Sequence, residues 1–585
     1  MYNGGIMNTI RLKTPFEVSD VPLSEYPRPQ FARDSYKTLN GWWDYAVYKS
    51  KDGFPGWQGK ILVPYSPECL LSGLPEGIEV KPDDELRYRL KFTVEESFLK
   101  AHTFLHFDAV DCYATVVLNG VELGTHVGGY TPFGFDVTGV VKAGGNILEV
   151  LVTDPSDTSY HSRGKQKLRH GGIWYTPQSG IWQSVWMESV PEAYLGDITI
   201  IPDIDRDKLV LKLDTVGADS ADIAVMDGNK LLKAVKVQGK IAEIDLDNYE
   251  LWSPENPKLY DLAVKVGDDV VRSYFGMRKF SVVTDRKGFK RLALNNKPYF
   301  HTGVLDQGYW SDGMLTPPSN AALEYDVKLV KSLGFNMIRK HIKIEPLRWY
   351  YHCDKEGVLV WQDMVSGGTN YNFAAIGVLP FVGIHLKDNK YKFFSRADEE
   401  GRKEYISEMY DTVARLKNVV SLAVWVPFNE GWGQFDSVKI TEMLRAADPT
   451  RIIDSVSGWH DQGKKTSQLK SLHVYFKPIR IPNDERCIVL SEFGGYSLPT
   501  EGHMFSPDKL FGYKMYKTPE QLAAAFRKLY EKSVIPAIDK GLSAAVYTQV
   551  SDVEEEINGL VTYDRRIVKI DRETARDVNS KLVIK

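Results

Sequence analysis

The feature that most constrains the fold is a regular alternation of strand and helix patterns from about residue 284 to the C-terminus. Short apolar runs, typical of strands buried on both faces, are separated by stretches that mostly carry helical periodicity. Repeated strand–helix units in about 300 residues predict a (β/α)8 barrel over residues 284–585. The eight runs are 299–304, 336–340, 359–362, 422–426, 452–456, 472–475, 488–490 and 544–548.

The preceding sequence has a different pattern, which predicts two β-sandwich domains. Residues 1–195 consist of short alternating runs between turn signals, with no helix of convincing length. Asn119-Gly120 lies between two such runs and predicts a hairpin, so we expect a two-sheet jelly roll here. Residues 196–283 carry short strands in fewer than a hundred residues, which predicts a small immunoglobulin-like sandwich with a packing role.

Charge and hydropathy limit the partners of the chain. The formal net charge of the 585 residues is −4 and there is no long basic block, so binding of nucleic acid or of an anionic membrane is not favoured. No apolar run is long enough to span a membrane. The first residues lack the apolar segment of a signal peptide, so we expect a cytoplasmic protein, or a periplasmic or secreted one if a leader has been removed. A homo-oligomer is possible.

The cysteine pattern argues against metal clips and disulfides. The four cysteines show no CxxC spacing, so buried free thiols are the expectation. No tight His/Asp cluster such as HxH is present, so we expect neither a metal nor a cofactor, and a metal-dependent barrel hydrolase is disfavoured.

Polar side chains follow the predicted strands, where a barrel places its active site. Glu430 follows the fourth strand and Glu492 the seventh, and these two strands face each other across the mouth of a barrel. Retaining glycosidases use two carboxyl groups about 5–5.5 Å apart, so the pair predicts glycoside chemistry. The other candidates at strand ends are Asp306, Arg339, His341, Asp363, Asn429, Trp459, His473, Tyr475 and Tyr547, and Trp432 follows Glu430.

Short landmark stretches lie along the whole chain: V-V-L-N-G at 116–120, G-T-H-V-G-G-Y-T-P-F at 124–133, S-G-I-W at 179–182, W-S-P-E-N-P at 252–257, F-G-M-R at 275–278, N-E at 429–430 and S-E-F-G at 491–494. In these stretches the chain resembles glycoside hydrolase family 2, the superfamily of β-galactosidases, β-glucuronidases and β-mannosidases. The resemblance implies a retaining exo-β-glycosidase, β-galactosidase-like with its sugar unresolved, that acts on a glycoside or oligosaccharide. It implies that Glu430 is the acid/base, that Glu492 is the nucleophile and that Asn429 binds the sugar 2-hydroxyl.

The remaining candidates have roles that the sequence leaves open. Arg339 would hold Glu492 charged, and Tyr475 would position it through its phenol. His341 and His473 either contact sugar hydroxyls or are satisfied core histidines. Asp306 and Asp363 either bind hydroxyls or pair with Lys340 and Arg339, and Trp432 and Trp459 either stack on sugar or pack loops. Tyr547 stands where better-known members place a tryptophan at the floor of the site.

Three further features concern the surroundings of the site and the reaction. The insertion 366–396 is either a decorating loop or one wall of the cleft, and Glu554-Glu555-Glu556 is expected to be a solvated charge run. The sequence has no clear match to the Asn-x-Lys signature of β-glucuronidases. An inactive carbohydrate-binding protein on the same scaffold and a transglycosylase remain alternatives.

Overall fold

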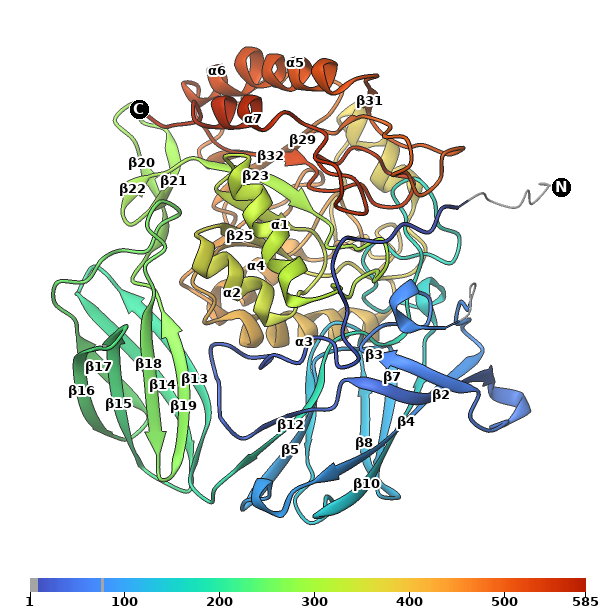
Figure 1. Cartoon of the computed structure of the whole chain (residues 1–585). Helices are drawn as coiled ribbons and strands as arrows, with labels where there is room; N and C mark the ends of the chain where they lie inside the picture. Colours follow the sequence, from blue (N-terminus) through green and yellow to red (C-terminus); the bar gives the residue numbers. More distant parts are fainter. Residues whose placement is uncertain (1–8, 75–77) are drawn as a thin grey trace.

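The computed structural model describes residues 9–74 and 78–585, which form three consecutive domains (Figure 1). Two β-sandwiches lie against one side of an α/β barrel, and the chain passes through them before it enters the barrel. The predicted class, jelly roll followed by immunoglobulin-like sandwich and (β/α)8 barrel, is confirmed.

The N-terminal jelly roll consists of two antiparallel sheets. Alternate residues of the strands, such as Leu86 and Tyr88, point between the sheets and are fully buried. Asn119 (φ 53°) and Gly120 (φ 79°) form the predicted hairpin turn with both central residues in the left-handed region. The strands of the first sheet are β1 (Tyr36–Thr38), β12 (Val185–Val190), β5 (His102–Phe107) and β9 (Phe133–Asp136); those of the second are β3 (Gly59–Val63), β2 (Gly41–Lys49), β4 (Asp84–Val94), β10 (Gly144–Thr153), β7 (Tyr113–Leu118) and β8 (Val121–Val127), and β6 (Val110–Asp111) pairs separately with β11 (Gly180–Ile181).

The second domain is a smaller sandwich of a three-stranded and a four-stranded antiparallel sheet. Its first strand spans the predicted boundary at 195/196, so the domain begins slightly earlier than predicted. The strands are β13 (Tyr194–Asp203), β14 (Lys208–Val216) and β17 (Ile241–Asp245) in one sheet, and β16 (Lys230–Gln238), β15 (Ser220–Asp227), β18 (Tyr260–Val266) and β19 (Asp269–Phe275) in the other.

A short antiparallel sheet of β20 (Phe280–Thr284), β21 (Lys290–Leu294) and β22 (Lys297–Pro298) leads into the barrel. Arg291 of β21 donates to the carbonyl oxygens of Leu542 (2.7 Å) and Ile538 (2.8 Å), which fixes this sheet to the N-terminal end of the barrel. β20 therefore belongs with the barrel, although the predicted boundary at 283/284 assigns most of it to the sandwich.

Eight parallel strands form the barrel, and one seam between neighbouring strands is unpaired. The seam lies between β27 and β28, where the side chain of Gln468 accepts a hydrogen bond from the amide of Ile453 (3.2 Å). The strands in spatial order are β27 (Ile452–Ile453), β26 (Leu422–Val426), β25 (Leu359–Asp363), β24 (Met337–Lys340), β23 (His301–Asp306), β32 (Leu542–Thr548), β29 (Cys487–Gly494) and β28 (Leu469–Val474).

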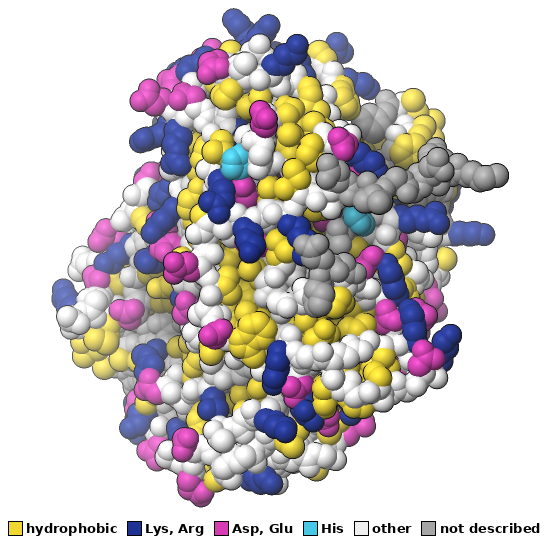
Figure 2. Space-filling model, turned by 45° about the vertical axis from the view of Figure 1, so that its right-hand side comes forward, with side chains coloured by type: hydrophobic (Ala, Val, Ile, Leu, Met, Phe, Trp, Pro, Cys, Tyr) yellow, Lys and Arg dark blue, Asp and Glu magenta, His cyan; other side chains and the backbone are white. Residues whose placement is uncertain are grey.

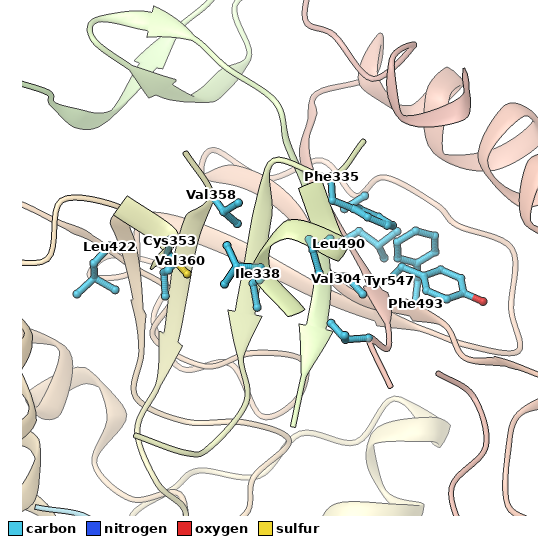
Figure 3. Close-up of a cluster of buried hydrophobic side chains, with 14 of the residues drawn as sticks. Val304, Phe335, Ile338, Cys353, Val358, Val360, Leu422, Leu490, Phe493 and Tyr547 are labelled. Atoms are coloured by element: carbon cyan, nitrogen blue, oxygen red, sulfur yellow. The ribbon is translucent and has the colours of Figure 1, made fainter. Parts of the chain in front are cut away.

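The barrel strands are apolar on both faces because two separate cores use them. Outward-facing residues such as Val304, Ile338 and Leu490 pack with Cys353 of α2 and with other buried groups (Figure 3). Inward-facing residues such as Met337 and Val424 fill the barrel interior together with β20 and β21. This double burial explains the continuous apolar runs in the sequence.

Helices surround the barrel, and their ends follow local signals. The Ser319 side chain accepts a hydrogen bond from the amide of Ala322 and caps α1, while Gly334 at φ 84° follows its C-terminus, as predicted. The helices are α1 (Asn320–Ser332), α2 (Leu347–Glu356), α3 (Glu399–Leu416), α4 (Ser437–Ala447), α5 (Pro519–Leu529), α6 (Ile535–Ile538) and α7 (Arg572–Asn579), and the short strands β30 (Tyr496–Ser497) and β31 (Lys514–Met515) lie in a loop after β29.

The charged surface and the state of the cysteines are as expected from the composition. Acidic and basic side chains are interspersed on the face seen in Figure 2. All four cysteines are buried and free, as predicted. None of the helices in the described part of the chain has the length and apolar character needed to cross a membrane.

Candidate active site

The two predicted glutamates meet at the C-terminal mouth of the barrel. Glu492 lies within β29, and Glu430 follows β26 in a left-handed conformation (φ 49°), with its amide bonded to the carbonyl of Ser457 (2.9 Å). One carboxylate oxygen of each glutamate and one ring nitrogen of His473 all lie within 4.8 Å of one another. The loop after β26 and the strand β29 therefore bring both carboxyl groups to one point.

Glu492 is held by positively charged and hydrogen-bonding groups. Arg339 Nη1 lies 3.1 Å from Oε1, and the hydroxyl of Tyr475 donates to Oε2 at 2.5 Å. Burial alone would raise the pKa of Glu492, but His473 and the guanidinium of Arg339 outweigh burial and lower this pKa to about 2. Glu492 is therefore ionised at neutral pH.

Glu430 has the opposite electrostatic environment. Burial and the nearby charge of Glu492 raise its pKa above the usual value for a glutamate. His473 Nδ1 lies 2.8 Å from Glu430 Oε1, and its Nε2 lies 2.9 Å from the hydroxyl of Ser457. The two carboxyl groups therefore differ in protonation, which suits one for nucleophilic attack and the other for proton transfer.

Arg339 organises the floor of the site. It is fully buried and binds Asp363 through Nε and Nη2, both at 2.9 Å, while Nη2 also donates to Asn429 Oδ1 at 2.8 Å. This contact fixes the Asn429 amide with its Nδ2 buried and without a partner among the described residues, which leaves a donor for a ligand. His341 Nδ1 lies 2.7 Å from Asp363 Oδ2, and burial lowers the pKa of His341, so its ring is neutral.

Asp306 belongs to a separate cluster of ion pairs. It lies 2.5 Å from Lys340 Nζ, which also contacts Glu345 at 2.7 Å. Lys343 contacts the same oxygen of Glu345 at 2.8 Å. Of the two alternatives for Asp306 and Asp363, the structure shows pairing with lysine and arginine.

Tyr547 does not reach the mouth of the barrel, so its predicted place at the floor of the site is wrong. Its ring is fully buried in the core outside the barrel, where it packs against Phe493, Phe526 and Tyr530 (Figure 3). Because side chains alternate along a strand, the next residue, Thr548, points inward instead. Its hydroxyl lies 3.1 Å from that of Tyr475.

The N-domain loop, residues 154–179 between β10 and β11, forms part of the wall of the site. It runs from the jelly roll to the barrel, where the amides of Arg163 and Gly164 bond to the carbonyl of Ser366 (3.0 and 2.9 Å). Trp174 of this loop packs against Trp432, with ring centroids 5.4 Å apart. A loop of one domain therefore completes the site of another.

The insertion 366–396 forms the adjoining wall of the site. Of the two predictions for it, a decorating loop or a wall of the cleft, the structure agrees with the wall. Tyr371 stacks on Trp432 at a centroid distance of 6.3 Å, and Arg396 donates to the carbonyl of Gly433 (3.0 Å). The insertion contains a π-helical turn at Ala374–Val378 and a 3₁₀ turn at Pro380–Val382. Trp432 is only 4% exposed within this packing, whereas Trp459 is half-buried, with its ring centroid 6.4 Å from that of His473.

The predicted solvated run Glu554-Glu555-Glu556 is wrong, because these residues fasten the N-domain loop. Glu554 accepts from the amide of Thr176 (3.0 Å), Glu555 from that of Gly172 (2.8 Å), and Glu556 from the hydroxyl of Tyr175 (2.5 Å). Glu554 and Glu556 are buried. Their partners lie almost four hundred residues earlier, so no local pattern could reveal them.

Several residues of the site escaped the sequence reasoning. Thr548 could have been found by the alternation rule applied to β32. Tyr513, whose ring stacks on Tyr475 at 4.0 Å, lies in a long loop without a periodic pattern. Trp174 and Tyr371 belong to other parts of the chain, and only the tertiary structure brings them to Trp432.

Family comparisons agree with this architecture in all three domains. The family models described as glycosyl hydrolase 2 galactose-binding domain-like, glycosyl hydrolases family 2, and glycosyl hydrolases family 2, TIM barrel domain match residues 76–181, 193–278 and 286–574. The chain belongs to glycosyl hydrolase family 2.

Individual relatives are distant. A β-galactosidase of Thermoanaerobacter pseudethanolicus is 23% identical over 445 residues, which cover 71% of this chain and 54% of the relative. A putative β-glucuronidase of Formosa agariphila is 28% identical over 280 residues, which cover 44% of this chain and 32% of the relative. The chain thus spans about half or less of the length of these curated relatives.

Solved structures match over almost the whole chain. A β-D-glucuronidase structure of Dictyoglomus thermophilum has a TM-score of 0.73 at 17% identity and covers 96% of this chain and 99% of its own. A β-galacturonidase of Eisenbergiella tayi has a TM-score of 0.68 at 18% identity and covers 97% and 98%. At this identity the likeness concerns the fold.

Proposed function

We propose that this protein is a retaining exo-β-glycosidase, which removes a terminal sugar through a covalent glycosyl-enzyme intermediate. The observation that carries the proposal is the meeting of Glu430 and Glu492 within 4.8 Å with opposite shifts of their pKa values. Retaining glycosidases hold their carboxyl groups about 5–5.5 Å apart, whereas inverting ones need about 6.5–9.5 Å to admit a water molecule. The observed separation supports retention.

In the first step, Glu492 attacks the anomeric carbon while Glu430 protonates the departing oxygen. Arg339 and Tyr475 keep Glu492 ionised and hold its two oxygens in place. The free Nδ2 donor of Asn429 supports a role in binding a hydroxyl of the sugar, where a hydrogen bond that strengthens in the transition state accelerates the step.

In the second step, Glu430 removes a proton from water, which attacks the glycosyl-enzyme and releases the sugar. Once Glu492 is esterified its charge is gone, so the repulsion that raised the pKa of Glu430 is relieved. Glu430 then becomes a base without any movement of the protein. The contact of His473 with Glu430 supports the same cycle, because the imidazole stabilises the newly formed carboxylate.

A panel of aryl β-glycosides tests the activity, and proton NMR tests the stereochemistry. The galactoside, glucoside, mannoside, glucuronide and arabinopyranoside should be compared side by side, and at least one should be hydrolysed. The first product signal should be that of the β-anomer. Early appearance of the α-anomer would contradict retention, and sugar binding without any turnover would favour the inactive binding protein.

Transglycosylation shares the glycosyl-enzyme intermediate and the same two carboxyl groups. Products formed at high concentration of a sugar acceptor separate the two reactions, because a hydrolase continues to release free sugar as its main product. Predominant formation of new glycosides at low acceptor concentration would assign the chain to the transglycosylases.

A further inference from the structure

The N-domain loop carries three cations at alternate positions, and all three lie over aromatic rings at the wall of the site. The guanidinium of Arg163 lies 5.0 Å from the ring centroid of Tyr371, and Lys167 Nζ lies 3.9 Å from that of Trp174. Between them, Lys165 Nζ lies 5.6 Å from the centroid of Trp432. We call residues 163, 165 and 167 with these rings the cationic wall.

Lys165 is the unusual member of the cationic wall. Its side chain is only 6% exposed, and in the described part of the chain its ammonium group has neither a carboxylate oxygen within 4.0 Å nor a hydrogen-bond acceptor. Its ring contacts are with Trp432 and with Tyr175, whose centroid lies 5.5 Å away. The ammonium lies near enough to Glu430 and His341 for its charge to lower the pKa of both groups.

The ring contacts leave the charge of Lys165 available. A cation–π contact compensates only part of a full positive charge. The ammonium nitrogen does not belong to the fully enclosed, unpartnered side-chain atoms of the described residues, so a ligand in the site can reach it. Two carboxylates that hold the loop, Glu554 and Glu555, accept from the backbone amides of Thr176 and Gly172 and form no ion pair with Lys165. Arg163, the neighbouring cation of the wall, cannot neutralise Lys165. Its guanidinium donates to the carbonyl oxygens of Gly368 and Thr369.

We propose that Lys165 binds a negatively charged group of the substrate, so that the glycoside cleaved at Glu430 and Glu492 is an acidic sugar. The charged group is a carboxylate, as in a uronic acid, or a sulfate ester. Arg163 and Lys167 add to the positive potential of the wall, and Trp432 provides an apolar face beneath the ammonium. This inference rests on the proposed function for the place and reaction of the substrate, but the binding of the anion can be measured separately.

The sharpest variant is Lys165→Met, which keeps the length of the side chain and removes its charge. We expect its kcat/KM for an acidic aryl glycoside to fall by at least thirtyfold more than its kcat/KM for the matching neutral glycoside. Lys165→Arg should recover most of the difference, because it restores the charge. Equal losses on acidic and neutral substrates, without recovery in Lys165→Arg, would show that Lys165 only supports the loop and would overturn the proposal.

The substrates distinguish the two sources of charge. Aryl β-glucuronide and β-galacturonide represent the carboxylate, aryl β-galactoside carrying a 6-sulfate represents the sulfate ester, and the unmodified glucoside and galactoside are the neutral references. The matched control is Lys258→Met in the immunoglobulin-like domain, since Lys258 also lies over a ring, that of Tyr260 at 5.1 Å, but is paired with Asp227. Its ratio of acidic to neutral activity should equal that of the unmodified protein.

Calorimetry with free sugars separates this inference from the proposed function. Glucuronate or galacturonate should bind the unmodified protein at least tenfold more tightly than glucose or galactose, and Lys165→Met should abolish the difference; for the sulfate ester, galactose 6-sulfate takes the place of the uronate. Such binding without turnover would contradict the proposed hydrolysis and support the anion site. Hydrolysis of neutral glycosides alone, with no binding of any of these anions, would support the proposed hydrolysis and overturn the anion site.

Discussion

Two buried charge clusters begin at neighbouring residues of β24 and differ in how completely their charges are paired. Lys340 leads to the first, in which two lysines and the carboxylates of Asp306 and Glu345 lie 2.5–2.8 Å apart. Arg339 leads to the second, in which it binds both Asp363 and Glu492. Because successive side chains of a strand alternate in direction, one strand serves both clusters.

The two clusters differ in what they offer a ligand: the first consists of structural ion pairs, and the second is the candidate active site. In the first cluster two positive charges meet two negative ones, and Glu345 Oε2 is a buried oxygen without a partner among the described residues. In the second, Asn429 keeps a buried donor without a partner, and Glu430 keeps a carboxyl group with a raised pKa. Burial, charge and an unpartnered atom are common to both clusters, so the opposite pKa shifts of Glu430 and Glu492 are what distinguish the second cluster.

The largest expected effect is that of Glu492→Ala, which removes the proposed nucleophile from the second cluster. We expect kcat on an accepted aryl glycoside to fall on the order of 10⁴-fold or more. The fold should persist, because Arg339 keeps its two bonds to Asp363. Circular dichroism and thermal unfolding provide the control, and activity within tenfold of the unmodified protein would contradict the assignment.

Glu430→Gln should have the next largest effect, a loss of about 10²–10⁴-fold in kcat/KM, because it removes the proposed general acid. Hydrolysis requires Glu430 protonated, so activity of the unmodified protein should fall as the pH rises through its raised pKa. The variant cannot titrate there, so its residual activity should lack this alkaline decline. The measurement is the pH profile of kcat/KM on an aryl glycoside for the unmodified protein and for the variant. If the variant kept the same alkaline decline, the decline would have to come from a group other than Glu430.

Lys340→Met tests the first cluster, where we expect a loss of stability. Two buried carboxylates lose a partner, which costs about 3–5 kcal/mol when an ion pair is broken on one side. The measurement is the shift of the urea and thermal unfolding transitions. Lys328→Met is the control, since Lys328 forms only a surface pair with Glu324 and should change these transitions little.

Tyr475→Phe should have the smallest effect of the three variants in the second cluster. It removes one hydrogen bond to a charged carboxylate, worth about 1.5–3 kcal/mol, so we expect a 10–100-fold loss in kcat/KM. The lost donor stabilised the ionised form of Glu492, so the pKa of Glu492 should rise and the acid limb of the pH profile should move to higher pH. An unmoved acid limb would restrict Tyr475 to a packing role.

The sequence predicted the barrel best where burial is strongest. The bounds of β26 are those predicted, because both faces of Leu422–Val426 are buried and its apolar run is uninterrupted. β27 and β28 border the unpaired seam, and their bounds were predicted less well. The prediction for β27 is too long, and the prediction for β28 begins too late. The hydrophobic pattern weakens where a strand lacks a neighbour, so its ends cannot be read from it.

The errors concern direction and distant partners. Tyr547 is a polar aromatic residue at the end of a strand, and the pattern does not show whether its ring faces the barrel or the helices. Glu554 and its two neighbours have the composition of a solvated run, yet a loop from the jelly roll covers them. Such contacts join residues that are distant in sequence, so periodicity carries no signal for them.

The sequence by itself determined the order of the domains, the eight strands and the two glutamates at their ends, because these depend on local periodicity and on one rule about barrel mouths. The tertiary structure alone decided the protonation of those glutamates, since their pKa values depend on Arg339, His473 and Tyr475 from other strands. It also decided that a lysine of the first domain lies at the wall of the site. Electrostatic energies depend on distance in space, and only the folded chain fixes those distances.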